Sequence, residues 1–146
     1  MKRGRILEPK VLAIVGQALN TKWGQQGKVK RTGLRMKKEY ASIGASPDGE
    51  TDVAVLEIKC PSDQKTVKNY YGNNKMKDKY RAQLQGQMFF ANKSIGYFCV
   101  ADPEIEVNKR IKIIREIFDK PFTLALLTRA MDSWRKAIFP RSMECC

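Results

Sequence analysis

The sequence predicts an α/β or α+β domain whose sheet is covered by helices. Apolar residues recur at helical spacing near both ends of the chain, and short runs rich in β-branched residues lie between them. In chain order these segments are helix, strands, helix, strands, helix. With 146 residues, 42% of them hydrophobic, the chain is long enough to bury one core, so a single domain over residues 1–146 is expected.

The first helix is predicted to begin near Glu8, with Pro9 in its first turn, and to end before Gly24. The apolar residues that follow Glu8 at helical spacing are Leu12, Val15 and Leu19. Glu8 therefore lies on the inward stripe, which is an unusual place for a carboxylate. It either serves a site or complements the helix dipole in the first turn.

Segments 28–35 and 39–45 are predicted strands, and the Ser-Pro-Asp-Gly sequence at 46–49 has the chemistry of a turn. A stronger strand is expected over residues 53–59. Since side chains alternate along a strand, Val55, Glu57 and Lys59 share one face, and Leu56 and Ile58 share the other. Glu57 and Lys59 therefore point the same way.

The second half of the chain is predicted to contain a partly helical stretch at 65–79, a helix at 77–91, strands at 95–101 and 109–116, and a last helix at 122–139. Tyr80, Gln83 and Gln87 lie on one face of the helix at 77–91. Tyr80 is also a candidate core residue. The core stripe expected in the last helix is Leu127, Met131, Trp134 and Ile138.

The composition favours a protein that binds nucleic acid. Lys and Arg outnumber Asp and Glu by 28 to 15, which gives a net charge of +13; the alternative is a solvated basic surface without a partner. The absence of histidine excludes histidine triads and histidine bases, so catalysis would depend on carboxylates, lysine or a metal. The four cysteines lack zinc or disulfide spacing, and no signal peptide or membrane span is expected, so the protein is predicted to be intracellular, in the cytoplasm or nucleus of a host cell.

Asp48, Glu57 and Lys59 are the candidate catalytic residues. If their two segments form a hairpin, Asp48 and Glu57 converge and offer the hard oxygen ligands that Mg²⁺ prefers. Lys59 can then orient a water molecule and stabilise charge on a phosphate. The alternative is structural, with a common Pro-Asp-Gly turn and a cross-strand ion pair on a solvent-exposed edge.

The motifs at 43–49 and 56–61, followed by Tyr80-x-x-Gln83-x-Gln85-x-Gln87, resemble the YqaJ-like viral recombinase and lambda exonuclease family. The resemblance extends from about Arg3 to Asp102 and implies a PD-(D/E)XK core, with a central mixed sheet flanked by helices. It also implies that Asp48, Glu57, Glu8 and the Ile58 carbonyl bind one or two Mg²⁺ ions, for which Mn²⁺ can substitute. The resemblance further implies that Lys59 assists the nucleophile and that Tyr80 and Gln83 join the site.

Two basic clusters are expected to grip the DNA backbone without reading its sequence, or else to be solvated faces. The first cluster is Lys28, Lys30, Arg31, Arg35, Lys37 and Lys38, and the second is Lys65, Lys68, Lys75, Lys77 and Lys79. Tyr70 and Tyr71 are candidates either for stacking on an unpaired base or for ordinary packing.

The expected function is a Mg²⁺-dependent 5′–3′ exonuclease on double-stranded DNA ends, in viral or phage-type recombination or genome processing. The alternatives are a structure-specific or nicking endonuclease on the same core, and a catalytically silent basic DNA-binding protein. A single-strand annealing protein is a candidate partner. The resemblance leaves open whether the chain forms a homo-oligomer.

Overall fold

A four-stranded mixed sheet forms the centre of the protein. In the computed structural model, which describes residues 2–24, 29–31, 33, 35–37, 44–72 and 75–137, its strands are β3 (Gly49–Glu50), β4 (Ala54–Lys59), β7 (Ile95–Ala101) and β8 (Ile111–Ile117). The strand order is β3-β4-β7-β8, with β4 and β7 parallel and the other two pairs antiparallel. The mixed α/β prediction is thus confirmed.

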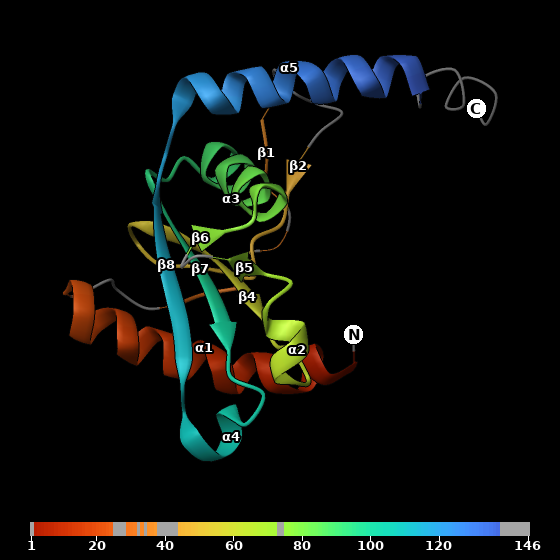
Figure 1. Cartoon of the computed structure of the whole chain (residues 1–146). Helices are drawn as coiled ribbons and strands as arrows, with labels where there is room; N and C mark the ends of the chain where they lie inside the picture. Colours follow the sequence, from red (N-terminus) through yellow and green to blue (C-terminus); the bar gives the residue numbers. More distant parts are fainter. Residues whose placement is uncertain are drawn as a thin grey trace.

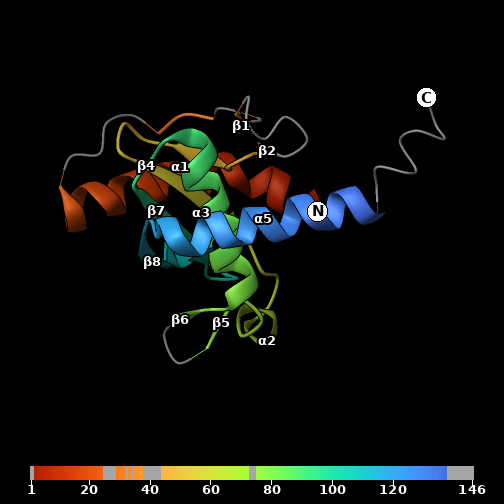
Figure 2. The ribbon, with the colours of Figure 1, turned by 90° about the horizontal axis from the view of Figure 1, so that it is seen from above.

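Helices lie on both faces of this sheet. Figure 1 shows α1 (Lys2–Trp23) on one face, α3 (Asp78–Ala91) on the other, and α5 (Lys120–Ala137) beyond α3. From above, α5 crosses α3 (Figure 2). Within the described residues, every helix is too short or too polar to span a bilayer.

Shorter elements complete the chain. They are β1 (Arg35–Met36) and β2 (Gly44–Ala45), which pair with each other, α2 (Gln64–Val67), the hairpin of β5 (Tyr71–Gly72) and β6 (Lys75–Met76), and α4 (Ile105–Asn108). Neither the β5–β6 hairpin nor α4 was predicted. Of the strand expected at 28–35, the described residues contain only a bridge between Lys30 and Glu50 and the first residue of β1. Gly33, with φ +71°, interrupts the extended backbone there. Of the strand expected at 39–45, only residues 44 and 45 are described, and they form β2.

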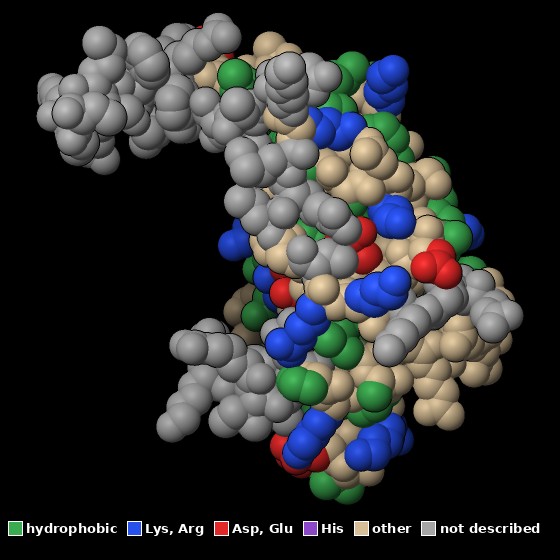
Figure 3. All heavy atoms as spheres, turned by 180° about the vertical axis from the view of Figure 1, so that it is seen from behind, with side chains coloured by type: hydrophobic (Ala, Val, Ile, Leu, Met, Phe, Trp, Pro, Cys, Tyr) green, Lys and Arg blue, Asp and Glu red, His purple; other side chains and the backbone are tan. Residues whose placement is uncertain are grey.

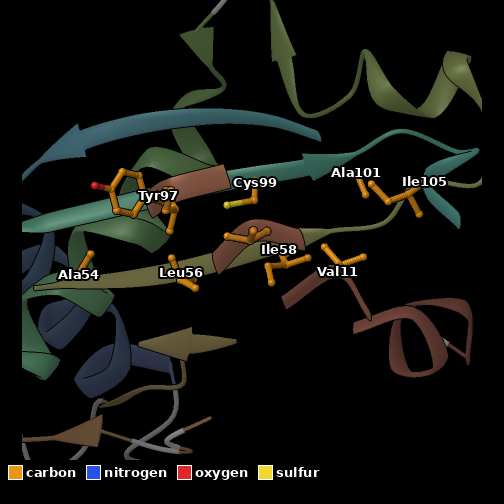
Figure 4. Packing of buried hydrophobic residues seen from close by; sticks show 10 residues of the cluster. Val11, Ala54, Leu56, Ile58, Tyr97, Cys99, Ala101 and Ile105 are labelled. Atoms are coloured by element: carbon orange, nitrogen blue, oxygen red, sulfur yellow. The ribbon is translucent and has the colours of Figure 1, made fainter. Parts of the chain in front are cut away.

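Helix α1 begins at Lys2, six residues before the predicted start, and Pro9 lies inside it. A proline removes one helical hydrogen bond and can kink a helix without ending it. Val11, Val15 and Leu19 are fully buried. They pack against Ala54, Leu56, Ile58 and Cys99 on the first sheet face (Figure 4).

The opposite sheet face packs against α3. Val55, Phe98 and Val100 contact Leu84 and Met88 there. This division confirms the predicted alternation along β4. Gly96 lets the helix approach closely, because a Cβ at this position would lie 2.8 Å from Leu84 Cγ.

The reversal between β3 and β4 lies at Thr51–Ala54, so the predicted turn at 46–49 is placed wrongly. Thr51 Oγ1 accepts hydrogen bonds from Ala54 N at 3.0 Å and Val53 N at 3.2 Å, and its own N–H donates to the Ala54 carbonyl. A threonine hydroxyl can close such a turn without a Pro-Asp-Gly sequence. The hairpin that the candidate site requires is nevertheless present.

Candidate active site

Glu57, which belongs to β4, lies at the centre of the candidate site. It is only 4% exposed and faces α3. Its Oε1 accepts a hydrogen bond from Gln87 Nε2 at 2.9 Å, and its Oε2 accepts one from Gln83 Nε2 at 3.1 Å. Lys59 Nζ forms a salt bridge with the same Oε2 at 3.1 Å. A buried carboxylate needs such partners to offset the loss of its hydration, and these three donors supply them.

Asp48 is brought beside Glu57 by the hairpin. The β3–β4 register ends at the pair of Gly49 with Leu56, so Asp48 lies just beyond it, near Glu57, which follows Leu56 on β4. Asp48 N donates to the Leu56 carbonyl at 3.0 Å, and Asp48 Oδ2 accepts the Ile58 N–H at 2.7 Å. The carboxylate thus takes the place of a backbone acceptor in the ladder.

Cys99 lies beside the candidate site, because it pairs with Ile58 across β4 and β7. This thiol is fully buried next to Ile58 on the first sheet face (Figure 4). Burial raises the pKa of Cys99, and the charges of Asp48 and Glu57 raise it further. The thiol therefore stays neutral at ordinary pH.

Lys59 is a cation at neutral pH. Burial pushes its pKa downward, but the carboxylates of Glu57 and Asp48 outweigh this effect and hold the pKa above its ordinary value of 10.5. Its Nζ also lies 5.3 Å from the centroid of the Tyr80 ring. A protonated lysine cannot accept a proton, so its contribution is positive charge and hydrogen-bond donation.

Helix α3 supplies the polar side chains that face Glu57. Tyr80, Gln83 and Gln87 lie on one face of the helix, as predicted. Tyr80 packs against Phe98 and Tyr70, with centroids 5.4 and 5.3 Å away, so it is both a core residue and a neighbour of Lys59.

Gln87 was not among the predicted site residues, yet it is buried at 2% exposure and contacts Glu57 directly. Its spacing of four residues from Gln83 was the available signal. Its Oε1 has no hydrogen-bond partner among the described residues.

The donor set suits a hard divalent cation. Two adjacent carboxylates and the Ile58 carbonyl at the end of β4 are oxygen ligands of the kind that Mg²⁺ prefers. The described side chains contain no group of three or more His, Cys, Asp or Glu residues arranged to hold a metal. The side chain of Glu8 lies outside them, although its backbone belongs to α1.

The residues predicted to contact DNA differ in their exposure and in their partners. Lys30, Arg31, Lys65, Lys68, Lys75 and Lys77 are exposed. Lys37 is half-buried, donates a hydrogen bond to Asn92 Oδ1 and lies 4.7 Å from the Phe89 ring centroid, so it caps the end of α3. Lys28, Lys38 and the side chain of Arg35 lie outside the described residues. Figure 3 shows Lys and Arg side chains spread over one face, with Asp and Glu among them.

A mixed sheet flanked by helices is the fold that the sequence motifs predict. The chain belongs to the YqaJ-like viral recombinase domain family, whose model matches residues 1–94. No curated protein sequence matches the chain.

Solved structures of exonucleases share the fold. An alkaline exonuclease from Laribacter hongkongensis matches with a TM-score of 0.71 at 22% identity, covering 100% of this chain and 75% of that one. Its complex with dAMP gives a TM-score of 0.69 at 23% identity, covering 100% and 75%. A phage-related exonuclease from Haemophilus somnus gives 0.68 at 15% identity, covering 99% and 73%. These likenesses show that the fold is shared over essentially the whole of this chain.

Proposed function

We propose that this protein is a Mg²⁺-dependent deoxyribonuclease that digests double-stranded DNA from its 5′ ends in viral or phage-type recombination. The observation that carries the proposal is the buried Glu57 carboxylate, held by three donors beside a second carboxylate. Such an arrangement is costly in a fold that needs it only for stability, because burying a carboxylate requires every compensating contact. The exonuclease neighbours favour digestion from ends over internal cutting.

Asp48, Glu57 and the Ile58 carbonyl are the proposed metal ligands, with Glu8 as a third carboxylate. Val11, one helical turn after Glu8, packs in the same cluster as Ile58, so this part of α1 lies near the end of β4 (Figure 4). A bound divalent cation supplies positive charge to the phosphate oxygens and lowers the pKa of water.

The remaining residues act on the substrate or on Glu57. Lys59 donates hydrogen bonds to the attacking water and to the scissile phosphate, where its charge stabilises the transition state. Gln83 and Gln87 fix the direction in which Glu57 presents its oxygens. The Tyr80 ring limits the rotamers available to Lys59.

The exposed lysines are proposed to hold the DNA backbone. Lys65 and Lys68 lie on and after α2, which follows the catalytic end of β4, and Lys75 and Lys77 lie near the start of α3. Contacts of this kind are independent of sequence and weaken with salt. A single-strand annealing protein is the proposed partner for the strand that digestion leaves behind.

The test is digestion of linear and of closed circular duplex DNA, each with Mg²⁺ or EDTA. We expect loss of the linear DNA alone, release of label from the 5′ end first, and no digestion with EDTA or with Lys59→Ala. Lys120→Ala, an exposed residue at the start of α5, is the matched control and should digest normally. Cutting of the circle would make the protein an endonuclease, and no metal-dependent cutting of either substrate would leave a DNA-binding protein.

A further inference from the structure

A groove opens at the edge of the sheet where β4 and β7 end and β8 begins. It encloses about 540 Å³, and its apolar floor comes from α1, α2, β7 and β8. Tyr71, Lys109, Arg110 and Lys112 line it together with a single acidic residue, Asp102. None of these residues belongs to the proposed catalytic site.

The Asp102 carboxylate is hydrogen-bonded to three groups of the protein itself. Its Oδ1 accepts hydrogen bonds from Glu104 N at 2.9 Å and Asn108 Nδ2 at 3.0 Å, and its Oδ2 accepts one from Gln64 Nε2 at 3.2 Å. Three basic residues against this one carboxylate leave the described lining with two positive charges in excess. The groove therefore favours an anionic ligand.

The strand register aligns the groove with the catalytic lysine. Lys59 pairs with Val100 on β7, and Val100 pairs with Lys112 on β8, so the three side chains form one row on the face that α3 covers. At the usual spacing between strands, the backbones at Lys59 and Lys112 are about 10 Å apart. This separation is on the order of a few nucleotide steps along a DNA strand.

One side of the groove is aromatic. Lys112 Nζ lies 4.3 Å from the centroid of the Tyr71 ring, and Tyr71 is half-buried at the start of the β5–β6 hairpin. Tyr70, its neighbour, packs instead against Tyr80 and Phe98 in the core. An apolar floor, an aromatic ring and cations at the rim match an unstacked nucleotide, whose base needs apolar contact and whose phosphate needs positive charge.

We infer that this groove binds an unpaired nucleotide of the DNA strand, a few steps from the scissile phosphate. The inference depends on the proposed function for the identity of the ligand as DNA. The base lies on the apolar floor against Tyr71, and the phosphate contacts Arg110 and Lys112. Duplex DNA cannot fill the groove in this way, because its bases are stacked and paired, so the groove selects an opened end.

The first test compares two variants that each lose two positive charges. Arg110→Gln/Lys112→Gln alters the groove, and Lys120→Gln/Arg129→Gln alters exposed residues of α5, which lies beyond α3 and away from the groove. Fluorescence anisotropy in EDTA measures binding of a blunt duplex and of the same duplex with a short thymidine tail. We expect the groove variant to bind the tailed duplex about tenfold more weakly than the α5 variant does, with equal affinities for the blunt duplex. Equal loss in both variants on both probes would overturn the inference, since only total charge would then matter.

The second test does not depend on any variant folding. A tail carrying 5-iododeoxyuridine is cross-linked to the wild-type protein by light, and the adduct is mapped by mass spectrometry. An adduct on Tyr71 is the expected result, and adducts confined to other peptides would contradict it.

The two proposals fail separately. If the wild-type protein cuts linear DNA with Mg²⁺ but the groove variant binds the tail as the α5 variant does, the groove inference is wrong and the nuclease stands. If no DNA is cut but the groove variant alone loses tail binding, the nuclease proposal is wrong and the groove inference stands.

Discussion

Two buried glutamines of helix α3 should respond to the same substitution in opposite ways. Gln85, fully buried, donates to the Ile117 carbonyl at 2.9 Å and accepts from Asp119 N at 2.9 Å and Thr123 Oγ1 at 3.0 Å. It joins α3 to the start of α5. Gln87 instead donates to Glu57 Oε1, and its own Oε1 is without a partner among the described residues.

Gln85→Met leaves the Ile117 carbonyl and the Asp119 N–H without their partner. Each such loss costs about 1–3 kcal/mol, and both groups lie near the surface, so we expect the free energy of unfolding to fall by about 2–4 kcal/mol. For a domain of this size, that fall lowers Tm by about 4–16 °C.

Gln87→Met has two opposing effects on stability. It removes a hydrogen bond to a charged carboxylate, worth about 1.5–3 kcal/mol, and also removes a buried acceptor whose lack of a partner costs about 1–3 kcal/mol. The free energy of unfolding should therefore change by about 1 kcal/mol or less. The rate of DNA cleavage should fall by about 10–100-fold, because Glu57 loses the donor that orients it.

Urea denaturation and digestion of linear duplex DNA, measured on both variants, test this contrast. Gln85→Met should lose stability but keep a rate near wild type well below its Tm, whereas Gln87→Met should keep stability and lose rate. If Gln87→Met unfolds as easily as Gln85→Met, or cuts at the wild-type rate, the assigned division between structural and positioning glutamines is wrong.

Three further outcomes are expected. Mg²⁺ should raise the Tm of the wild-type protein but not that of Asp48→Asn in thermal scans against EDTA, because the variant lacks a charged ligand. The Lys59 pKa is raised above 10.5, so its ion pair should stabilise the fold fully below pH 10.5 and lose effect as pH rises through the higher folded pKa; urea titrations should show no such loss in Lys59→Met. Gly96→Ala should lower the free energy of unfolding by about 1–3 kcal/mol in urea, since its Cβ would meet Leu84 Cγ at 2.8 Å.

The sequence predicted best the longer elements that form the buried centre of the fold. The strand Ile95–Ala101 has its predicted bounds, and α3 begins within one residue of its predicted start. The alternation along β4 placed Glu57 and Lys59 on one face, which the salt bridge between them confirms. Local periodicity determines these features, so a single sequence carries them.

Features that depend on distant residues could not be predicted. The predicted start of α1 was wrong because a helix can continue through a proline such as Pro9. The β3–β4 reversal was misplaced because Thr51 closes it with its hydroxyl. The row that joins Lys59 to Lys112 exists only through the register of three strands, two of which are separated by α2, the β5–β6 hairpin and α3. No local pattern encodes that register.

Strand β8 has a consequence for how the protein behaves at high concentration. It is seven residues long, lies at the edge of the sheet and pairs only with β7 in the described part of the chain. Four of its residues are isoleucine, and Ile117 is 54% exposed, so its outer edge is a template for strands from other molecules. Lys112, Arg115 and Glu116 interrupt that template as charged gatekeepers. Neutralising them would favour aggregation, which ties the solubility of the protein to the same lysine that lines the groove.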